Sequence, residues 1–426
     1  MCAGGVLQET PVGRRGHSQF DVCFKETNLH ALTKYPKIHG CHAKITLMRL
    51  AVLILASLPL LGQTETPKTE EALRVLFLGN SYTYYNSLPD MVAAISNSTP
   101  GRRIETKSVT RGGATLQDLW HLTNALETLR SGTWDYVVLQ DQSTLGENYV
   151  DGKWGVNEPN GLLRWVRIWN AEIQRKNAKP MLYLTWGRKA YPEFQTGLNY
   201  AYAEAAREIG ATISPVGLAW KRIRETQPQI ELFDADGTHP SPLGTYLNAC
   251  VFVEVLMGKT CEGAMRNPTT LRVSEETQRL LTEAAHFAVE QYKAGILTSL
   301  PKPDYGTLKP LPPSTVSKSE DFTGTWRGKA TMYNATQDVE LKLEGNGRTC
   351  RGSITLSSKQ RQTSLSYPLS NCTIDMTTLI FLTSDPRFLV EEYKAVIDGD
   401  KLVGTHTLRN TDPYVRLQGS FELRKD

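Results

Sequence analysis

The sequence predicts a three-layer α/β domain followed by a small all-β domain. Within residues 71–300, continuous apolar runs alternate with helical stretches, which is typical of a parallel sheet covered by helices. A proline-rich segment follows, and after it the pattern changes to short alternating strands separated by Gly, Asn and Asp turns. With 426 residues, the chain is long enough for two such domains.

The first domain contains five runs with strand character. We expect strands at residues 73–78, 104–109, 136–140, 181–186 and 212–216, and helices at residues 88–96, 116–129, 162–176, 198–209, 218–225, 243–256 and 275–294. Strands without polar alternation are buried on both faces. The pattern therefore predicts a flavodoxin-like three-layer sandwich with a five-stranded parallel sheet, whose binding site lies at the carboxyl ends of the strands.

The second domain is predicted to be a small antiparallel β-barrel or sandwich at residues 321–426. Residues 301–320 form the Pro-rich linker before it. Strands are expected at residues 325–333, 338–343, 352–356, 378–382, 391–397, 401–408 and 418–423. The opening run GTWRG at residues 324–328 is similar to the start of lipocalin-like barrels.

The N-terminal region has the layout of a targeting segment. One positive charge, a short apolar core, a proline and small residues follow Met48. We therefore expect translation to start at Met48, residues 48–62 to be a signal peptide, residues 1–47 to be a mispredicted extension, and the protein to be secreted or periplasmic. The alternative is a real N-terminal tail with an internal anchor. The apolar core is short for a bilayer span, so no stable membrane insertion is expected.

Cysteines and charge limit the possible partners. Starting at Met48 leaves Cys250, Cys261, Cys350 and Cys372, an even number for an oxidising compartment. Their order suggests one bridge in each domain, 250–261 and 350–372, although spacing alone does not decide connectivity. No spacing resembles a zinc site, and we expect no metal and no cofactor. The net charge of +4 is small for 426 residues, and no nucleic-acid partner is expected.

Two short segments suggest nucleophilic catalysis. The first apolar strand ends at Gly79, and Ser81 follows on a sharp turn before a helix, a geometry that exposes a hydroxyl at the sheet edge. Far downstream, Asp236 lies three residues before His239, close enough to orient the imidazole. The three other histidines after Met48 lie in helices or in the β domain, where structural roles are expected; they are His121, His286 and His406.

Two further segments could stabilise a developing negative charge. Gly113 belongs to a glycine pair after the second strand, where a backbone N–H could approach a substrate; the alternative is an ordinary loop glycine. Gln140 ends the third strand, and its amide could donate to an oxyanion; the alternative is an amide that only satisfies loop backbone groups.

These segments occur in the order found in the SGNH/GDSL hydrolase superfamily, which residues 71–295 resemble. The resemblance implies a flavodoxin-like fold and a metal-independent Ser–His–Asp ester hydrolase. Ser81 matches the nucleophile, His239 the base and Asp236 its orienting acid. The matching oxyanion hole comprises the backbone N–H groups of Ser81 and Gly113.

The sequence departs from that superfamily at two positions. Asn80 replaces the usual aspartate of the first motif, and the usual asparagine donor is absent. By similarity to carbohydrate-esterase relatives, Gln140 is expected to replace that donor, and Gln142 is the alternative.

The sequence constrains the substrate less strongly. Trp186 could stack on a sugar ring, and Arg188 and Gln142 could face the cleft; packing and a surface charge are the alternatives for the first two. We expect a secreted serine esterase that hydrolyses short-chain or O-acetyl esters of a small molecule or glycan through an acyl-enzyme. The alternatives are a carbohydrate- or lipid-binding protein with a vestigial hydrolase domain, and acyl transfer to an alcohol.

Overall fold

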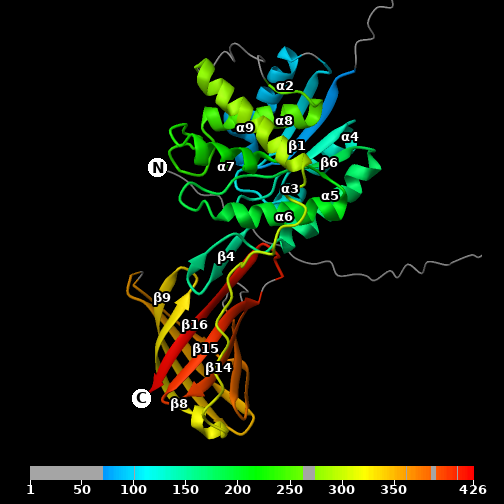
Figure 1. Cartoon of the computed structure of the whole chain (residues 1–426). Coiled ribbons are helices and arrows are strands. Elements are labelled where there is room, and N and C mark those ends of the chain that lie inside the picture. Colours follow the sequence, from blue (N-terminus) through cyan, green and yellow to red (C-terminus); the bar gives the residue numbers. More distant parts are fainter. Residues whose placement is uncertain (1–70, 100, 262–273, 361, 385–389, 410) are drawn as a thin grey trace, which may run out of the picture. The chain divides into compact units, whose positions relative to one another are not determined.

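The computed structural model describes residues 71–99, 101–261, 274–360, 362–384, 390–409 and 411–426 (Figure 1). The expected extension at residues 1–47, the start at Met48 and the signal peptide at residues 48–62 lie outside the described residues. Among the helices that are described, none has the length and apolar character needed to cross a membrane.

A five-stranded parallel sheet forms the centre of the first domain, as predicted. Its strands are β1 (Leu73–Gly79), β2 (Ile104–Thr110), β3 (Tyr136–Leu139), β6 (Lys179–Tyr183) and β7 (Thr212–Ser214). They pair in the order β2-β1-β3-β6-β7, with every neighbouring pair parallel. Because the chain leaves β1 first toward one edge and later returns to its other side, the order reverses at β1. Ligand sites of open α/β sheets lie at such a reversal.

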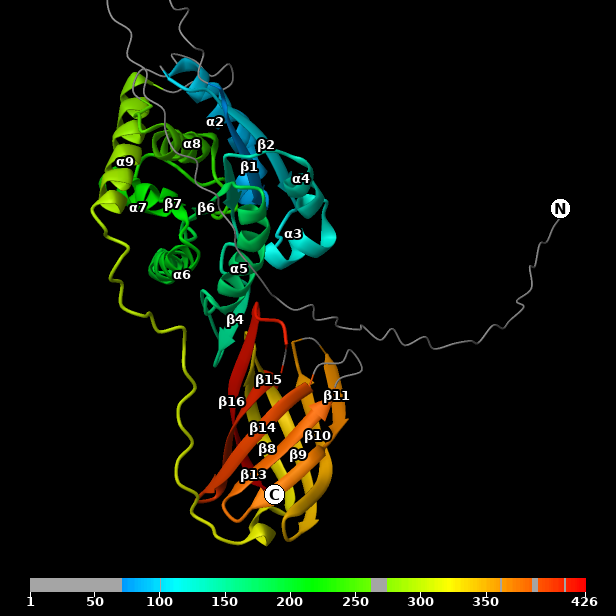
Figure 2. The ribbon, with the colours of Figure 1, turned by 90° about the vertical axis from the view of Figure 1, so that its right-hand side faces the viewer.

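Helices cover both faces of this sheet (Figure 2). Val75 and Phe77 of β1 join a core with helices α2 (Leu88–Ser98), α7 (Val216–Thr226), α8 (Pro242–Met257) and α9 (Glu275–Lys293). Leu76 and Leu78 point to the opposite face and join helices α3 (Leu116–Leu122), α4 (Ala125–Ser131), α5 (Asn160–Arg175) and α6 (Phe194–Ile209). Alternate residues of one strand therefore fill two separate cores, which confirms the three layers.

The structure differs locally from the expected helices. The single helix expected at residues 116–129 is two helices, because Thr123 interrupts it and its Oγ1 accepts a hydrogen bond from the Ala125 N–H. A four-residue helix, α1 (Ser81–Tyr84), and a 3₁₀ turn, η1 (Tyr85–Ser87), precede α2 and were not predicted. They place the first turn of helix directly after the nucleophile candidate.

The second domain is a closed antiparallel barrel of eight strands, as predicted. The strands are β8 (Gly324–Met332), β9 (Ala335–Asn346), β10 (Thr349–Ser358), β12 (Ser370–Asp375), β13 (Thr378–Ser384), β14 (Val390–Asp398), β15 (Lys401–Arg409) and β16 (Val415–Lys425). Pairing of β16 with β8 closes the ring, and β11 (Thr363–Pro368) pairs with β10 outside it. Strands β11 and β12 were not predicted.

Large side chains fill the barrel. Trp326, Phe381, Tyr393 and Phe421 are buried in one core cluster, and the rings of Phe381 and Tyr393 stack with centroids 4.7 Å apart. An eight-stranded barrel has an interior about wide enough for its own side chains.

The two expected disulfides have different outcomes. Cys350 and Cys372 are bonded and join β10 to β12, which confirms that bridge. Cys250 and Cys261 are both free thiols. Both are buried, and the expected 250–261 bridge is not formed, so that prediction was wrong.

A hairpin of the first domain contributes to the sheet of the second. It consists of β4 (Glu147–Val150) and β5 (Lys153–Trp154), and it follows β3 along the chain. Strand β4 pairs in parallel with β16, from Glu147 opposite Val415 to Val150 opposite Gln418. This pairing joins residues more than two hundred positions apart, so local sequence patterns could not predict it.

Candidate active site

The turn after β1 is built to hold Ser81 at the sheet edge. A Cβ at Gly79 would overlap Thr83 Oγ1 and lie 2.5 Å from Gln140 Oε1, so a side chain at this position has no room. The Asn80 side chain caps α1 by accepting a hydrogen bond from the Tyr82 N–H at 3.1 Å. The close packing therefore requires glycine at position 79.

Asn80 also explains one departure from the superfamily pattern. Its Nδ2 donates hydrogen bonds to the carbonyl oxygens of Ala114 at 3.0 Å and Asp141 at 3.3 Å. An ionised aspartate at this position could only accept, so it could not make these two bonds. The asparagine amide thus ties the nucleophile turn to the loops that follow β2 and β3.

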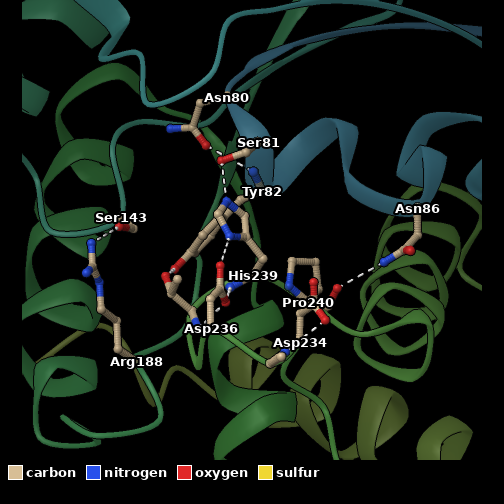
Figure 3. A network of polar contacts seen from close by, with 12 residues as sticks. Asn80, Ser81, Tyr82, Asn86, Ser143, Arg188, Asp234, Asp236, His239 and Pro240 are labelled. Atoms are coloured by element: carbon tan, nitrogen blue, oxygen red, sulfur yellow. Dashed lines mark hydrogen bonds and ion pairs between the residues drawn. The ribbon is translucent and has the colours of Figure 1, made fainter.

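Ser81, His239 and Asp236 form a chain of hydrogen bonds (Figure 3). His239 Nε2 lies 2.8 Å from Ser81 Oγ, and His239 Nδ1 is hydrogen-bonded to Asp236 Oδ2. Asp236 Oδ1 accepts from the backbone N–H groups of Thr238 and His239, both at 2.9 Å. The structure therefore brings together all three residues that the sequence predicted as a triad.

The hydrogen bonds around Asp236 favour its charged form. Burial works to raise the pKa of this carboxyl, but the bond to His239 and the backbone N–H groups of His239 and Thr238 lower the pKa below its ordinary value. An ionised carboxylate can only accept a hydrogen bond, so the proton of a neutral imidazole must be on Nδ1. That tautomer leaves Nε2 of a neutral ring free to accept the Ser81 proton.

Two aromatic rings orient His239, and the sequence analysis did not identify them. The Tyr85 ring stacks on the imidazole with centroids 4.1 Å apart and planes 12° apart. Tyr82 meets it edge-on at 5.6 Å, and its hydroxyl is hydrogen-bonded to Thr238 Oγ1. The sequence did contain a signal for them, because both tyrosines lie just after Ser81 in the run Tyr82-Thr83-Tyr84-Tyr85.

Trp186 is buried beneath the Tyr82 ring. It is 0% exposed, with one face stacked on Tyr82 at 4.5 Å and the other on Trp220 at 3.8 Å. Its indole N–H donates to the carbonyl of Thr238 at 3.0 Å. Because both faces of the ring are covered, this packing argues against the expected stacking on a sugar and assigns Trp186 to supporting the His239 loop.

Gly113 lies on an exposed loop between β2 and α3. Its φ of +69° is in the left-handed region, where glycine is favoured, and open space surrounds its Cβ position. The Arg111 N–H donates to the Gly79 carbonyl at 3.2 Å, which holds this loop against the end of β1. The loop therefore adjoins the end of the strand that precedes Ser81.

Gln140 is enclosed beneath the nucleophile turn. Its Oε1 accepts from the Asn80 N–H at 2.8 Å and from Thr83 Oγ1 at 2.9 Å, and its Nε2 donates to the Asp141 carbonyl. The residue is 0% exposed. A group without exposed surface has no access to a bound substrate, so the geometry argues against the prediction that Gln140 is the oxyanion donor.

Gln142, in contrast to Gln140, makes side-chain hydrogen bonds to the described residues only through its oxygen. It is half-buried, and its Oε1 accepts three hydrogen bonds, from Thr144 N–H at 2.7 Å, Thr144 Oγ1 at 2.9 Å and Gly146 N–H at 3.0 Å. Within the described part of the chain, its Nε2 donates no hydrogen bond. Since the amide is planar, fixing Oε1 also fixes the direction of the uncommitted NH₂ group.

Arg188 provides a positive charge beside this loop. Its Nη2 donates to Ser143 Oγ at 3.1 Å (Figure 3), and its guanidinium lies 4.6 Å from the centroid of the Trp154 ring. Its Nε is buried without a hydrogen-bond partner. None of the ion pairs between described residues involves Arg188, so no carboxylate neutralises it there.

The remaining histidines have neighbours of their own. His406 is buried in the barrel and its Nε2 lies 2.9 Å from the Thr331 carbonyl. His286 Nδ1 is 2.6 Å from Glu254 Oε1, and these two residues with Glu290 are the one group with closely spaced metal-ligand atoms that we find among the described residues. Glu254 is bonded to His286 and Glu290 pairs with Lys293, while Glu254 itself is buried and its Oε2 has no hydrogen-bond partner in the described part of the chain.

No family model and no curated protein matches the chain. Among solved structures, the chain is similar to a DUF4886 family protein from Bacteroides uniformis, at 18% identity over 51% of this chain and 95% of that chain, with a TM-score of 0.43. It is also similar to a lipase/acylhydrolase from Enterococcus faecalis, at 16% identity over 44% of this chain and 96% of that chain, with a TM-score of 0.33.

A third similar structure is a catalytic mutant of an acetylxylan esterase from Geobacillus stearothermophilus, at 12% identity over 44% of this chain and 93% of that chain, with a TM-score of 0.31. Likeness at this level carries no argument about activity. The function proposed below therefore depends on the geometry of the site.

Proposed function

We propose that this protein is a serine ester hydrolase. The observation that supports this most directly is the 2.8 Å contact between Ser81 Oγ and His239 Nε2, with Asp236 hydrogen-bonded to the other ring nitrogen. A serine becomes nucleophilic when an adjacent base takes its proton and a third group orients that base. All three parts are in hydrogen-bond contact.

The reaction has two halves. Ser81 Oγ attacks the ester carbonyl while its proton passes to His239 Nε2, and a tetrahedral oxyanion forms. Collapse of this intermediate breaks the bond to the leaving oxygen, which takes the proton from His239 and departs as an alcohol. Water then gives a proton to His239 and attacks the acyl-serine. The second intermediate releases the carboxylic acid and returns the proton to Ser81.

The oxyanion hole comprises the backbone N–H groups of Ser81 and Gly113 and the side-chain NH₂ of Gln142. We propose Gln142 in place of Gln140 because its NH₂ is uncommitted and the residue is only half-buried, whereas Gln140 has no exposed surface. A hydrogen-bond donor that is already held in place needs no reorganisation during the reaction. The three bonds to Gln142 Oε1 would hold the NH₂ group in this way.

The substrate proposed is a short-chain or O-acetyl ester of a small molecule or glycan, met outside the cytoplasm. Arg188 adds a preference to this proposal. A guanidinium without a carboxylate partner is suited to bind an anionic group. We therefore favour esters whose alcohol or acid portion carries a carboxylate, such as acetylated acidic sugars.

The test is hydrolysis of p-nitrophenyl acetate, followed by acetate release from a panel of acetylated neutral and acidic oligosaccharides. Ser81→Ala and His239→Ala should each remove nearly all turnover while the circular dichroism spectrum stays unchanged. Wild-type protein that is folded but releases neither nitrophenol nor acetate would exclude the hydrolase proposal. The vestigial-hydrolase alternative would then require glycan or lipid binding by the same full-length protein.

The acyl-transfer alternative uses the same three residues. Adding an acceptor alcohol to the nitrophenyl acetate assay separates the two reactions, because a transferase yields the acetylated alcohol and a hydrolase yields acetate. We expect acetate as the main product.

A further inference from the structure

The barrel domain contributes one side chain to the core of the α/β domain. Tyr414 lies in the segment between β15 and β16, yet it belongs to the same buried cluster as Leu76 and Leu78 of β1. It is 4% exposed. A Cβ on Gly161, in the first turn of α5, would lie 2.7 Å from the Tyr414 ring, so the ring packs directly on that backbone.

The hydroxyl of Tyr414 is hydrogen-bonded to the buried carboxylate of Asp141, the residue before Gln142 of the proposed oxyanion hole. It donates a hydrogen bond to Asp141 Oδ2 at 2.9 Å. Asp141 Oδ1 accepts from the N–H groups of Leu116 at 3.1 Å and Gln142 at 2.8 Å, and its backbone carbonyl accepts from Asn80 Nδ2 at 3.3 Å. Asp141 thus connects the nucleophile turn, the start of α3 after the Gly113 loop, and Gln142.

The backbone of Tyr414 supports the same loop from a second direction. Its carbonyl accepts from the Glu147 N–H at 2.7 Å, and a Cβ on Gly146 would overlap that carbonyl. The Gly146 N–H in turn donates to Gln142 Oε1 at 3.0 Å. The contacts of Tyr414 therefore reach both the carboxylate behind Gln142 and the turn that fixes its amide.

We propose that Tyr414 is a positioning residue through which the barrel holds the oxyanion-binding loop of the hydrolase in its working geometry. This inference rests on the hydrolase function proposed above. It makes the barrel a structural part of the enzyme, in contrast to an independent binding module attached by a linker. The physical reason is that a buried carboxylate needs every donor it has, so loss of one hydroxyl shifts the groups that share Asp141.

The primary test is Tyr414→Phe in the full-length protein, with Tyr305→Phe as the matched control. Tyr305 is also buried in this core, but its hydroxyl is a buried group without a hydrogen-bond partner, so its removal breaks no such bond. With p-nitrophenyl acetate, Tyr414→Phe should lower kcat on the order of tenfold to a hundredfold with little change in KM, as expected for small displacements of catalytic groups. Tyr305→Phe should keep the wild-type kcat.

The pH profile of kcat supplies a readout that a purely structural role would not change. Burial raises the pKa of Asp141 to about 7, and the hydrogen bonds from Gln142, Tyr414 and Leu116 oppose this rise. The negative charge of Asp118 also raises the pKa of Asp141. Tyr202 is neutral, and its hydroxyl oxygen accepts a hydrogen bond from the Asp141 N–H at 3.3 Å. Loss of the Tyr414 hydroxyl should therefore move the acidic limb of the profile to higher pH, and Tyr305→Phe should leave it in place.

The outcomes separate this inference from the hydrolase proposal. An inactive wild type excludes both. A wild type whose turnover depends on Ser81, together with a Tyr414→Phe variant of unchanged kcat and pH profile, excludes the positioning role alone. If Tyr414→Phe does not fold, the same two readouts are taken on Gly161→Ala, which presses a methyl group against the Tyr414 ring; unchanged kcat and profile there also overturn the inference.

Discussion

Gln142 is the residue whose replacement tests the proposed oxyanion hole most sharply. Its Oε1 holds the loop through three hydrogen bonds from Thr144 and Gly146, and only its NH₂ is assigned to the substrate. Gln142→Ala would remove both functions together. Losing three neutral hydrogen bonds at about 0.5–1.5 kcal/mol each could itself lower the free energy of unfolding by roughly 1.5–4.5 kcal/mol.

Gln142→Glu separates the two functions. One carboxylate oxygen can keep the three loop donors, while the other replaces the NH₂ and cannot donate. Loss of one oxyanion donor typically lowers kcat by about 10²–10³, which corresponds to roughly 2.7–4 kcal/mol of transition-state stabilisation. We expect at least this loss, because the new charge also repels the oxyanion. Gln142→Met is the uncharged companion; it removes the three loop bonds together with the NH₂, so it should lose stability as well as at least this much kcat.

The assay is steady-state hydrolysis of p-nitrophenyl acetate, with chemical denaturation of each variant to compare stability. Thr144→Val is the matched control, because it removes one bond to Oε1 but no donor to the substrate, and its kcat should stay within about threefold of wild type. If Gln142→Glu and Gln142→Met are folded and both keep kcat within about threefold of wild type, Gln142 is not the donor.

Three further predictions concern the surroundings of the site. Gly79→Ala should lower the free energy of unfolding by about 1–3 kcal/mol in chemical denaturation and also reduce kcat, because the new methyl overlaps Thr83 and crowds Gln140; an equally stable variant would contradict the close packing. Burial raises the pKa of Asp141 to about 7, above an unfolded value of about 3.9, so the folded state binds more protons between these values and this group makes stability fall as pH rises from roughly 4 to 7. The difference between wild type and Asp141→Asn across that pH range should show this slope, and a constant difference would refute it. Arg188→Met should raise KM for a carboxylate-bearing acetyl ester and leave KM for p-nitrophenyl acetate unchanged; equal effects on both would exclude anion binding.

The elements that the sequence predicted well are those with strong local patterns. Runs such as Leu73–Gly79 are apolar at every position because both faces of the sheet are covered, and this signal needs no knowledge of the partner strand. By contrast, β11 (Thr363–Pro368) is short, ends at a proline and is mostly exposed, including its apolar Leu365, so it gives a weak strand signal. The strand became recognisable only through its pairing with β10.

The candidate site also contains residues that local patterns predicted and residues whose side-chain directions they could not predict. Asp236 and His239 are three residues apart in a tight turn, so their contact follows from local geometry, and the strand-to-turn transition at Gly79 indicated Ser81. The directions of Gln140 and Gln142 could not be predicted in this way. Asn80 and Thr83 hold the first amide beneath the turn, and only the folded chain brings them to it.

From the sequence alone came the two-domain organisation, the layered fold and the three residues of the proposed triad, since hydrophobic periodicity and short spacings are properties of neighbouring residues. The tertiary structure decided that Gln140 is fully buried while Gln142 is not, that Trp186 is enclosed between two rings, and that Tyr414 reaches Asp141 from another domain. The reason is physical: side-chain direction and burial depend on atoms contributed by remote segments, and a linear pattern contains no information about which remote segment will arrive.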